Sequence, residues 1–244
     1  MSPVTKLYDE LAGWWPLLSP YEQYAEEAAF FIEVLSRAGL PPSPSLLELG
    51  SGGGNNAFYL KQLCPHPTLT DISPQMLAVS ARLNPDCEHI PGDMRTLRLG
   101  RHFDVVFIHD AIDYMTTREE LAQALATAAA HCKPGGLALF VPDALRETFE
   151  PSTEHGGHDG GGRALRYMEW SYDPDQADDT YEVEYVYVLR EGARDAHVEH
   201  ERHTCGLFAR AVWLLLLEQV GFHAESLPNE PYGREPFLAR RDLA

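Results

Sequence analysis

The stretch SLLELGSGGGNNAFYL, Ser45 to Leu60, joins an apolar run to a glycine turn and then to a segment of helical character. Four glycines stand within five residues, and the carboxylate of Glu48 precedes the first of them by two positions. Glycine lets the chain turn sharply and lets backbone N–H groups approach a ligand with no Cβ in the way. Because parallel sheets bind ligands at the carboxyl ends of their strands, the pattern predicts a ligand-binding turn in an α/β protein.

Strands and helices alternate around this turn. Ser73 caps one predicted helix with Pro74 at its first position, and Thr117 forms a capping box with Glu120 at the start of another. Strands are predicted at 45–49, 89–90, 103–110, 137–141, 222–227 and 236–240, and a further short strand ends at Asp71. Helices are predicted at 20–38, 56–63, 73–84, 117–131 and 208–220. This alternation predicts a mostly parallel sheet with helices on both faces.

The alternation is interrupted between residues 143 and 205. This part holds a polar tract, EHGGHDGGGR, and two strand-like runs at 181–189 and 196–204, which indicate an antiparallel hairpin. We therefore predict a main domain from residues 1–142 and 207–244, with residues 143–206 inserted as an antiparallel β cap. The glycines of the tract GGHDGGG favour a flexible gate over the cleft.

Composition narrows the function. The chain has 244 residues and a formal net charge of −18, so its surface repels phosphate backbones and nucleic acid is not expected as a partner. No apolar run has the length of a membrane span, the N-terminus is unlike a signal peptide, and the four cysteines form no CxxC pair. We expect a cytoplasmic protein without membrane or zinc partners. The acidity is explained either by solubility or by attraction of a cationic substrate.

Two nucleotide motifs are incomplete at the glycine turn. A phosphate-binding P-loop needs Gly-Lys-Ser/Thr, whereas Asn55 and Asn56 follow Gly54, and the dinucleotide pattern GxGxxG lacks its third glycine at Asn55. Asp71 follows Gly50 by 21 residues, the distance at which an acid reaches ribose hydroxyls. With Asp93 in PGDM as a third acid and no neighbouring cation for phosphates, the pattern indicates a positively charged nucleoside.

Five motifs carry a family resemblance. LLELGSGGG, LTDISPQML, PGDM, FDVVFIHDAIDYM and CKPGGLALF resemble, in order, the motifs of the class I S-adenosylmethionine-dependent methyltransferases. The resemblance is strong over about residues 40–142 and loose over 207–240. It implies a Rossmann-like, seven-stranded, mostly parallel sheet with an antiparallel last strand, which suits 236–240. It also implies S-adenosylmethionine as cofactor and S-adenosylhomocysteine as product.

The same resemblance implies roles for individual residues. It places Glu48 near the methionine amino group, Gly50 and Gly52 against the methionine part and ribose, and Asp71 at the ribose hydroxyls. The remaining implied cofactor residues are Ile72, Asp93 and Met94, the last two at the adenine, and His109 and Asp110, which face the sulfonium and the acceptor.

Acceptor-site residues are expected in three places. The aromatic N-terminal segment, with Tyr8, Trp14, Trp15 and Tyr21, suits a lid or plain packing, and Asp113 and Tyr114 after the fourth strand suit a binding or a capping role. In the cap, strand alternation places His203 and His197 on one face and His200 on the other. The catalytic candidates are His203, Tyr8 and His109, and the substrate-binding candidates are Trp14, Tyr21, Asp113, Tyr114 and His158. The histidine spacing, including His155 and Asp159, matches no zinc signature, so no metal is predicted.

A looser resemblance concerns the acceptor. YDELA near the start and ERHTCGLFARAVWLLLLEQVGF near the end are similar to small-molecule methyltransferases, including sugar-amine N,N-dimethyltransferases. We predict methyl transfer to a nitrogen or oxygen of a small metabolite. Nitrogen is favoured because residues 143–205 hold 16 Asp/Glu against 6 Arg/Lys. A nucleotide-binding oxidoreductase and a non-catalytic sensor of S-adenosylmethionine are the alternatives, and the choice between a monomer and a homodimer stays open.

Overall fold

The computed structural model describes residues 5–227 and 230–243. Its main sheet has seven strands in the order β11-β12-β5-β4-β1-β2-β3. β1 to β5 run parallel to one another, whereas β12 is antiparallel to both of its neighbours. The strands are β1 Leu46–Leu49, β2 Thr68–Asp71, β3 Glu88–Pro91, β4 Phe103–Ile108, β5 Cys132–Phe140, β11 Phe222–Ser226 and β12 Phe237–Arg241. The predicted mostly parallel sheet with an antiparallel last strand is confirmed.

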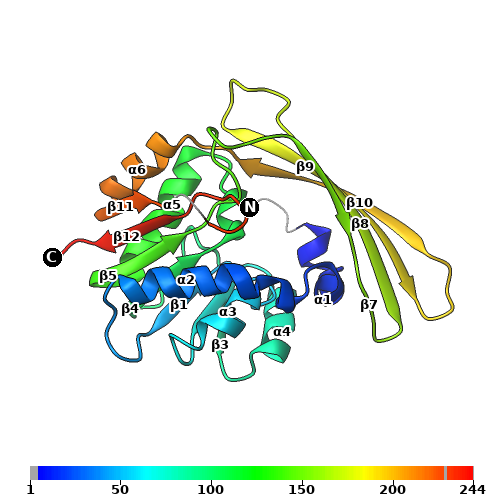
Figure 1. Ribbon diagram of the computed structural model, residues 1–244, viewed down its shortest axis with the longest axis horizontal. Coiled ribbons are helices and arrows are strands. Elements are labelled where there is room, and N and C mark those ends of the chain that lie inside the picture. The colour runs from blue at the N-terminus through cyan, green and yellow to red at the C-terminus, as the bar shows by residue number, and fades with distance from the viewer. Residues whose placement is uncertain (1–4, 228–229, 244) are drawn as a thin grey trace.

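Helices cover both faces of this sheet (Figure 1). One core joins β4 to α5 and α6, and the other joins the same strand to α2 and α3. Alternate residues of β4 supply the two cores: Val106 packs in the first, and Val105 and Phe107 pack in the second. Because β4 is buried on both faces, its sequence is a nearly continuous apolar run. The helices are α1 Trp15–Leu18, α2 Ala25–Arg37, α3 Asn55–Leu60, α4 Pro74–Leu83, α5 Arg118–His131 and α6 Arg210–Gln219.

The predicted helix starts are confirmed with one shift. Ser73 Oγ accepts the Met76 N–H at 3.1 Å, and Thr117 Oγ1 accepts the Glu120 N–H at 3.1 Å. The Glu120 carboxylate, however, reaches the N–H of Thr116, also at 3.1 Å, one residue before the cap. The predicted helix over 20–38 opens with a 3-10 turn at Tyr21–Tyr24 before α2 begins.

The inserted part forms a second sheet, which stands apart from the first (Figure 1). It orders its strands β10-β9-β8-β6, with β7 pairing β8, and all of these pairs are antiparallel. The strands are β6 Ser152–Gly156, β7 Asp159–Gly160, β8 Arg163–Tyr172, β9 Thr180–Glu191 and β10 His197–Gly206. The predicted hairpin is thus β9 and β10. This cap sheet lies within residues 143–206, and its status as a separate domain stays a prediction.

The expectation of a flexible gate is wrong, and three strands of the insertion, β6, β7 and β8, were missed from the sequence. The glycine tract is not a free gate, because it forms the end of β6, the whole of β7 and the turn into β8. Gly157 has a φ of +132°, and a Cβ there would clash with the backbone of Leu165. Gly157 therefore allows close strand packing, whereas Gly161 and Gly162, with φ values of +60° and +75°, form the turn into β8. β8 was missed because Met168 and Trp170 are exposed apolar residues on its outer face, so the polar–apolar alternation is lost.

Candidate active site

The glycine turn after β1 forms one wall of a cavity. Gly50, Gly52 and Gly54 have φ values of +72°, +51° and +77°, which other residues rarely adopt. A Cβ at Gly50 would clash with the side chains of Ala111 and Met94, both of which line the same cavity. The turn therefore brings bare backbone to the cavity.

Asp71 fixes the shape of this turn. Its Oδ2 accepts the Gly52 N–H and its Oδ1 accepts the Ser73 N–H, both at 2.8 Å. Burial raises the pKa of Asp71, and these backbone donors oppose the rise. Each oxygen keeps acceptor capacity that can receive a ligand hydroxyl. Ile72, which is 38% exposed, lines the cavity beside it.

Asp93 lines the same cavity with a cation that the sequence argument missed. Arg95 donates to both Asp93 oxygens, from Nε at 3.0 Å and from Nη2 at 2.7 Å, and Arg95 Nη1 reaches Glu120 at 2.6 Å. The expectation that no cation lies near the turn is therefore wrong. Two carboxylates already hold this guanidinium, so it brings little free positive charge to a phosphate.

Glu48 is the least compensated acid of the cavity. It is 2% exposed, and its Oε2 has no hydrogen-bond partner. Burial, together with the charges of Asp71 and Glu27, raises the pKa of Glu48 to about 8, and His109 opposes the rise. An orphaned buried carboxyl group beside bare glycine backbone fits a ligand that carries an ammonium or sulfonium charge. These residues thus fit S-adenosylmethionine.

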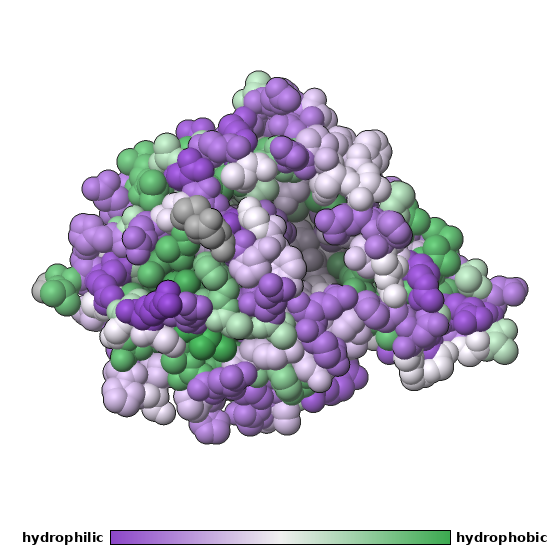
Figure 2. All heavy atoms as spheres, in the orientation of Figure 1, coloured by the Kyte–Doolittle hydropathy of each residue, from purple (hydrophilic) through white to green (hydrophobic). Residues whose placement is uncertain are grey.

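A second cavity of about 910 Å³ lies between the main body and the cap. Figure 2 shows the surface hollowed there. Six residues line both cavities and so mark where the two meet: Tyr8, Trp15, Tyr24, His109, Asp110 and Tyr114. A group held in the second cavity can therefore face a group held in the first across this junction.

Three predicted residues form a hydrogen-bonded chain at the junction. Tyr114 Oη donates to Tyr8 Oη at 2.9 Å, and His203 Nδ1 lies 2.7 Å from Tyr114 Oη. His203 is 2% exposed, and its Nε2 lies 3.3 Å from Glu201 Oε1. Residues from the N-terminal segment, the loop after β4 and the cap therefore share one path along which a proton can move.

His109 lies at the junction with both ring nitrogens occupied. Its Nδ1 is 2.6 Å from Asp110 Oδ1, and its Nε2 is 2.9 Å from Arg234 Nη1 and 3.4 Å from Glu27 Oε2. Burial lowers the pKa of His109, but Asp110 and Glu27 raise it further, to about 10. The arginine contact suits a neutral ring, because a guanidinium only donates. In either protonation state His109 has no free nitrogen for a substrate proton, which favours a positioning role.

Known proteins share this architecture. Residues 46–136 match the family described as a methyltransferase domain. The chain is 29% identical over 218 residues to the dTDP-3-amino-3,6-dideoxy-alpha-D-glucopyranose N,N-dimethyltransferase of Streptomyces fradiae, covering 88% of this chain and 84% of the relative. The structure of DesVI from Streptomyces venezuelae superposes with a TM-score of 0.81 at 26% identity, covering 92% of this chain and 94% of DesVI. The chain is an S-adenosylmethionine-dependent methyltransferase.

A further relative agrees with this assignment. The sugar N-methyltransferase KedS8 from a Streptoalloteichus species superposes with a TM-score of 0.81 at 25% identity, covering 90% of this chain and 88% of KedS8. The predicted cofactor and the predicted transfer of a methyl group to a small metabolite are confirmed for this methyltransferase. The oxidoreductase alternative is wrong, because the glycine turn belongs to a methyltransferase domain.

Three predicted acceptor residues of the methyltransferase line neither cavity. Trp14 lies under the Arg163 guanidinium at 4.8 Å, and Tyr21 packs on Phe58 with ring centroids 4.6 Å apart. His158 Nδ1 lies 3.2 Å from the Leu17 carbonyl oxygen. These side chains pack the N-terminal segment against the rest of the fold. For Trp14 and Tyr21 this agrees with the alternative of plain packing.

Asp113 and Tyr114 both line the second cavity, the one between the main body and the cap, which is called the acceptor-side cavity from here on. Asp113 is 4% exposed and accepts the Asp143 N–H at 2.8 Å, so it also fixes the chain after β5. On the cap, His203 faces this cavity, whereas His200 on the opposite face bonds Glu184 at 2.7 Å. The alternation expected for the cap histidines is confirmed.

Two residues at the junction were missed from the sequence. Glu27 of α2 and Arg234, from the loop before β12, form an ion pair inside the acceptor-side cavity. The signal for Glu27 was its place one helical turn before Phe31, which puts a carboxylate on the buried face of α2. Arg234 carried no comparable signal, because it lies in a loop whose path depends on the whole fold.

The described chain offers neither a membrane span nor a metal cluster. Within residues 5–227 and 230–243, no helix is long and apolar enough to cross a membrane. In the same residues, no group of three or more His, Cys, Asp or Glu side chains is arranged to hold a metal ion.

Proposed function

We propose that this methyltransferase methylates an amino nitrogen of a small, sugar-like acceptor. The observation that carries the proposal is the acidic, aromatic cavity that meets the cofactor cavity at Tyr8, Tyr114 and His109. Carboxylates attract a protonated amine, and aromatic faces pack against it. The relative from Streptomyces fradiae is named as an N,N-dimethyltransferase of an amino sugar, which supports nitrogen as the acceptor atom.

S-adenosylmethionine, when bound, supplies an electrophilic methyl group. We assign its binding to the residues around the glycine turn, namely Glu48, Gly50, Gly52, Asp71, Ile72, Asp93 and Met94, with His109 and Asp110 at the acceptor side. These residues orient the cofactor, and the N-terminal segment with Tyr8 and Trp15 excludes water from it.

At the junction, the acceptor nitrogen must present its lone pair and lose a proton. The bound cofactor would supply its methyl group to this lone pair, and the electrons of the sulfur–carbon bond would remain on sulfur. For the released proton to reach His203, the Tyr114 hydroxyl, which donates to Tyr8 in this structure, turns to donate to His203 Nδ1. Tyr8 then takes the proton from nitrogen as it passes its own to Tyr114. Proton transfer of this kind needs groups within hydrogen-bond reach, which the 2.9 Å and 2.7 Å contacts of Tyr114 satisfy.

Cofactor binding tests this function first. We expect calorimetry to detect S-adenosylmethionine and S-adenosylhomocysteine but not NADH. Asp71→Ala should lose roughly tenfold to hundredfold in affinity, because hydrogen bonds to a charged group contribute about 1.5–3 kcal/mol each. Asp86→Ala is the matched control, since Asp86 is an exposed acid that pairs with Lys61 at 2.8 Å. Unchanged binding in Asp71→Ala contradicts the proposed site.

Turnover then separates an enzyme from a sensor. Release of S-adenosylhomocysteine should occur with amino sugars and not with matched hydroxyl or phenol acceptors. Cofactor binding without turnover on any amine or hydroxyl acceptor would leave only the sensor function.

We propose a homodimer as the assembly. The outer face of the cap exposes Met168, Trp170, Val188 and Val198, and an apolar sheet face of this kind favours a protein contact. On the same face Glu184 pairs with Arg202, so both charges are present for a self-complementary contact with a second copy. Sedimentation should give a dimer that Trp170→Glu converts to a monomer, whereas Arg194→Glu at the hairpin end keeps it. A monomeric parent protein contradicts this proposal.

We also propose a cytoplasmic location without nucleic-acid partners. Cys64, Cys87, Cys132 and Cys205 are all free thiols, as a reducing compartment favours. The net charge of −18 opposes contact with phosphate backbones. Cell fractionation and a gel-shift assay with duplex DNA and RNA test the two statements.

A further inference from the structure

The acceptor-side cavity holds many more acids than bases. Among the residues 5–227 and 230–243 that the structure describes, Arg234 is the one Arg or Lys that lines it. Arg234 is itself held by Glu27, Asp110 and Glu230. The cavity thus offers little uncompensated positive charge to an anionic substrate. Its acids are Glu27, Asp110, Asp113, Asp143, Glu150, Glu154 and Glu169.

Two of these acids stand opposite each other on the cap. Glu154 of β6 is in direct register with Glu169 of β8, on the face that lines the cavity. Like charges in such a cross-strand pair are destabilising. Within the described chain, neither carboxylate forms an ion pair. Burial, together with the charge of Glu154, raises the pKa of Glu169 to about 7.

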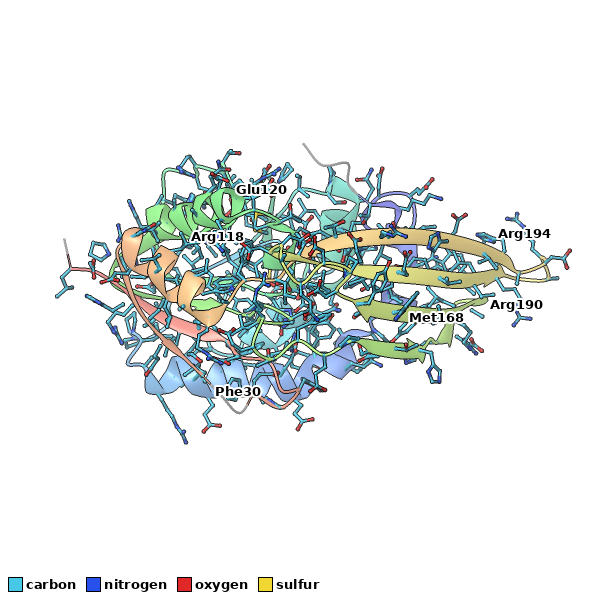
Figure 3. All side chains as sticks on the ribbon, turned by 90° about the horizontal axis from the view of Figure 1, so that it is seen from above. Phe30, Arg118, Glu120, Met168, Arg190 and Arg194 are labelled. Atoms are coloured by element: carbon cyan, nitrogen blue, oxygen red, sulfur yellow. The ribbon has the colours of Figure 1, made fainter. Side chains whose placement is uncertain are left out.

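The arginines of the cap do not compensate this pair. Arg166 bonds Asp159 at 2.7 Å, and Arg202 bonds Glu184 on the outer face. Figure 3 shows Arg190 and Arg194 at the far end of the β9–β10 hairpin, away from the main body. Glu154 and Glu169 therefore face the cavity, and none of these four arginines lines it.

One buried hydrogen-bond acceptor atom in the same cavity has no hydrogen-bond donor. Glu27 is 4% exposed, and its Oε1 has no hydrogen-bond partner although its Oε2 pairs with Arg234. A buried carboxylate oxygen without a donor is costly and is normally satisfied. The Nε of Arg234 in the same cavity also has no hydrogen-bond partner, so the junction end holds an unpaired acceptor and an unpaired donor, while the charge of Arg234 is balanced by the acids around it.

We propose that the acceptor is a compound without phosphate groups that carries at least two cationic nitrogens, one methylated at the junction and one held between Glu154 and Glu169. This proposal rests on the proposed N-methylation. It departs from the relative whose name specifies a dTDP-linked sugar, because a pyrophosphate in this cavity would face carboxylates and no free described Arg or Lys.

The sheet register sets the spacing of the two nitrogens. His203, at the junction, is in register with Val183 of β9, which is in register with Ser171 of β8, two residues from Glu169. Neighbouring strands lie about 4.8 Å apart, so β8 and β6 lie roughly 10 Å and 14 Å across the sheet from the strand of His203. The second cationic nitrogen should therefore lie about 10 Å or more from the first.

Two pairs of probes test this proposal on the whole enzyme saturated with S-adenosylhomocysteine. The first pair is 1,8-diaminooctane and 8-amino-1-octanol, which differ in the second charge. The second pair is 3-amino-3-deoxyglucose and its dTDP-linked counterpart. At low salt we expect calorimetry to give the diamine an affinity about tenfold above that of the amino alcohol. The free amino sugar should bind more tightly than its dTDP-linked form.

Variants locate the effect. Glu154→Gln combined with Glu169→Gln should abolish the preference, so that the diamine binds no more tightly than the amino alcohol. Glu191→Gln, on the same sheet at the hairpin end, should keep the preference. Equal affinity of the diamine and the amino alcohol, or tighter binding of the dTDP-linked sugar, overturns the proposal. Failure to bind S-adenosylhomocysteine would instead overturn the proposed function, so the two failures are distinguishable.

Discussion

At the scale of single residues, the ionisation of Glu48 affects both the stability of the protein and its binding of the cofactor. The pKa of Glu48 in the fold is about 8, above the value of an ordinary glutamate. Between pH 4.5 and 8 the folded state therefore holds a proton that the unfolded state has lost. Stability contributed by this proton is present below the unfolded pKa and is lost as pH rises through the folded pKa.

We predict that Glu48→Gln removes this pH dependence. The variant should gain stability over the parent as pH rises from 5 to 8.5, on the order of 3 kcal/mol, because glutamine has no charge to bury. Denaturant unfolding of the cofactor-free protein at the two pH values measures the gain. A constant difference between parent and variant would contradict the prediction.

The same residue predicts proton release on cofactor binding. At pH 7 the carboxyl group of Glu48 is protonated in the free protein, and a cationic cofactor favours the ionised form. Binding of S-adenosylmethionine should then release a proton, and this release should disappear in Glu48→Gln. Calorimetry in two buffers with different ionisation enthalpies measures it. Glu33→Gln, in an exposed ion pair with Arg37, is the control and should keep the release.

At the scale of elements, the N-terminal segment from Thr5 to Leu18 connects the cofactor cavity to the cap. Trp15 packs on Gly53 of the glycine turn, and Ser73 Oγ donates to the Tyr8 carbonyl oxygen. On the other side, Lys6 pairs with Glu199 at 2.8 Å. The segment therefore closes the cofactor cavity only when it is docked on both layers.

We predict that Gly53→Ala undocks this segment. A Cβ at Gly53 would clash with the Trp15 ring, whereas a Cβ at Gly13 in the same segment would have space. Gly53→Ala should weaken cofactor binding about tenfold, in the usual range for overpacking, and speed proteolysis within residues 9–19. Gly13→Ala should do neither. In a Trp15→Ala background, Gly53→Ala should add little further effect, and a full additional loss would contradict the packing argument.

At the scale of the whole molecule, charge should govern encounter with the acceptor. The net charge of −18 and the acids of the cavity attract a cation over several ångströms of solvent. We predict that kcat/KM for a cationic acceptor falls several-fold between 50 and 300 mM salt, because the Debye length shortens. A neutral analogue of the acceptor, with a hydroxyl group in place of the amine, should bind with little salt dependence. A flat salt series for the cationic acceptor would refute steering.

Much of the cofactor half was predictable because its signals are local. The glycines of the turn, Asp71 at a strand end and Asp93 in the next turn lie at spacings that a parallel sheet converts into neighbours. All three line the cavity after β1. The assignment of each to a part of the cofactor stays a prediction until binding is measured.

What only the tertiary structure decided is where distant residues meet. The sequence by itself determined the alternating sheet, the glycine turn and the order of its motifs, because each depends on neighbours within one or two elements. It could not pair Arg95 with Asp93 and Glu120, bring Arg234 to Glu27, or set Glu154 opposite Glu169. The contact of Arg95 with Glu120 depends on the packing of the main body, that of Arg234 on a loop near the end of the chain, and that of Glu154 on the register of the second sheet. Composition placed excess acid in the insertion, and only the register of its strands set Glu154 and Glu169 together on the cavity face.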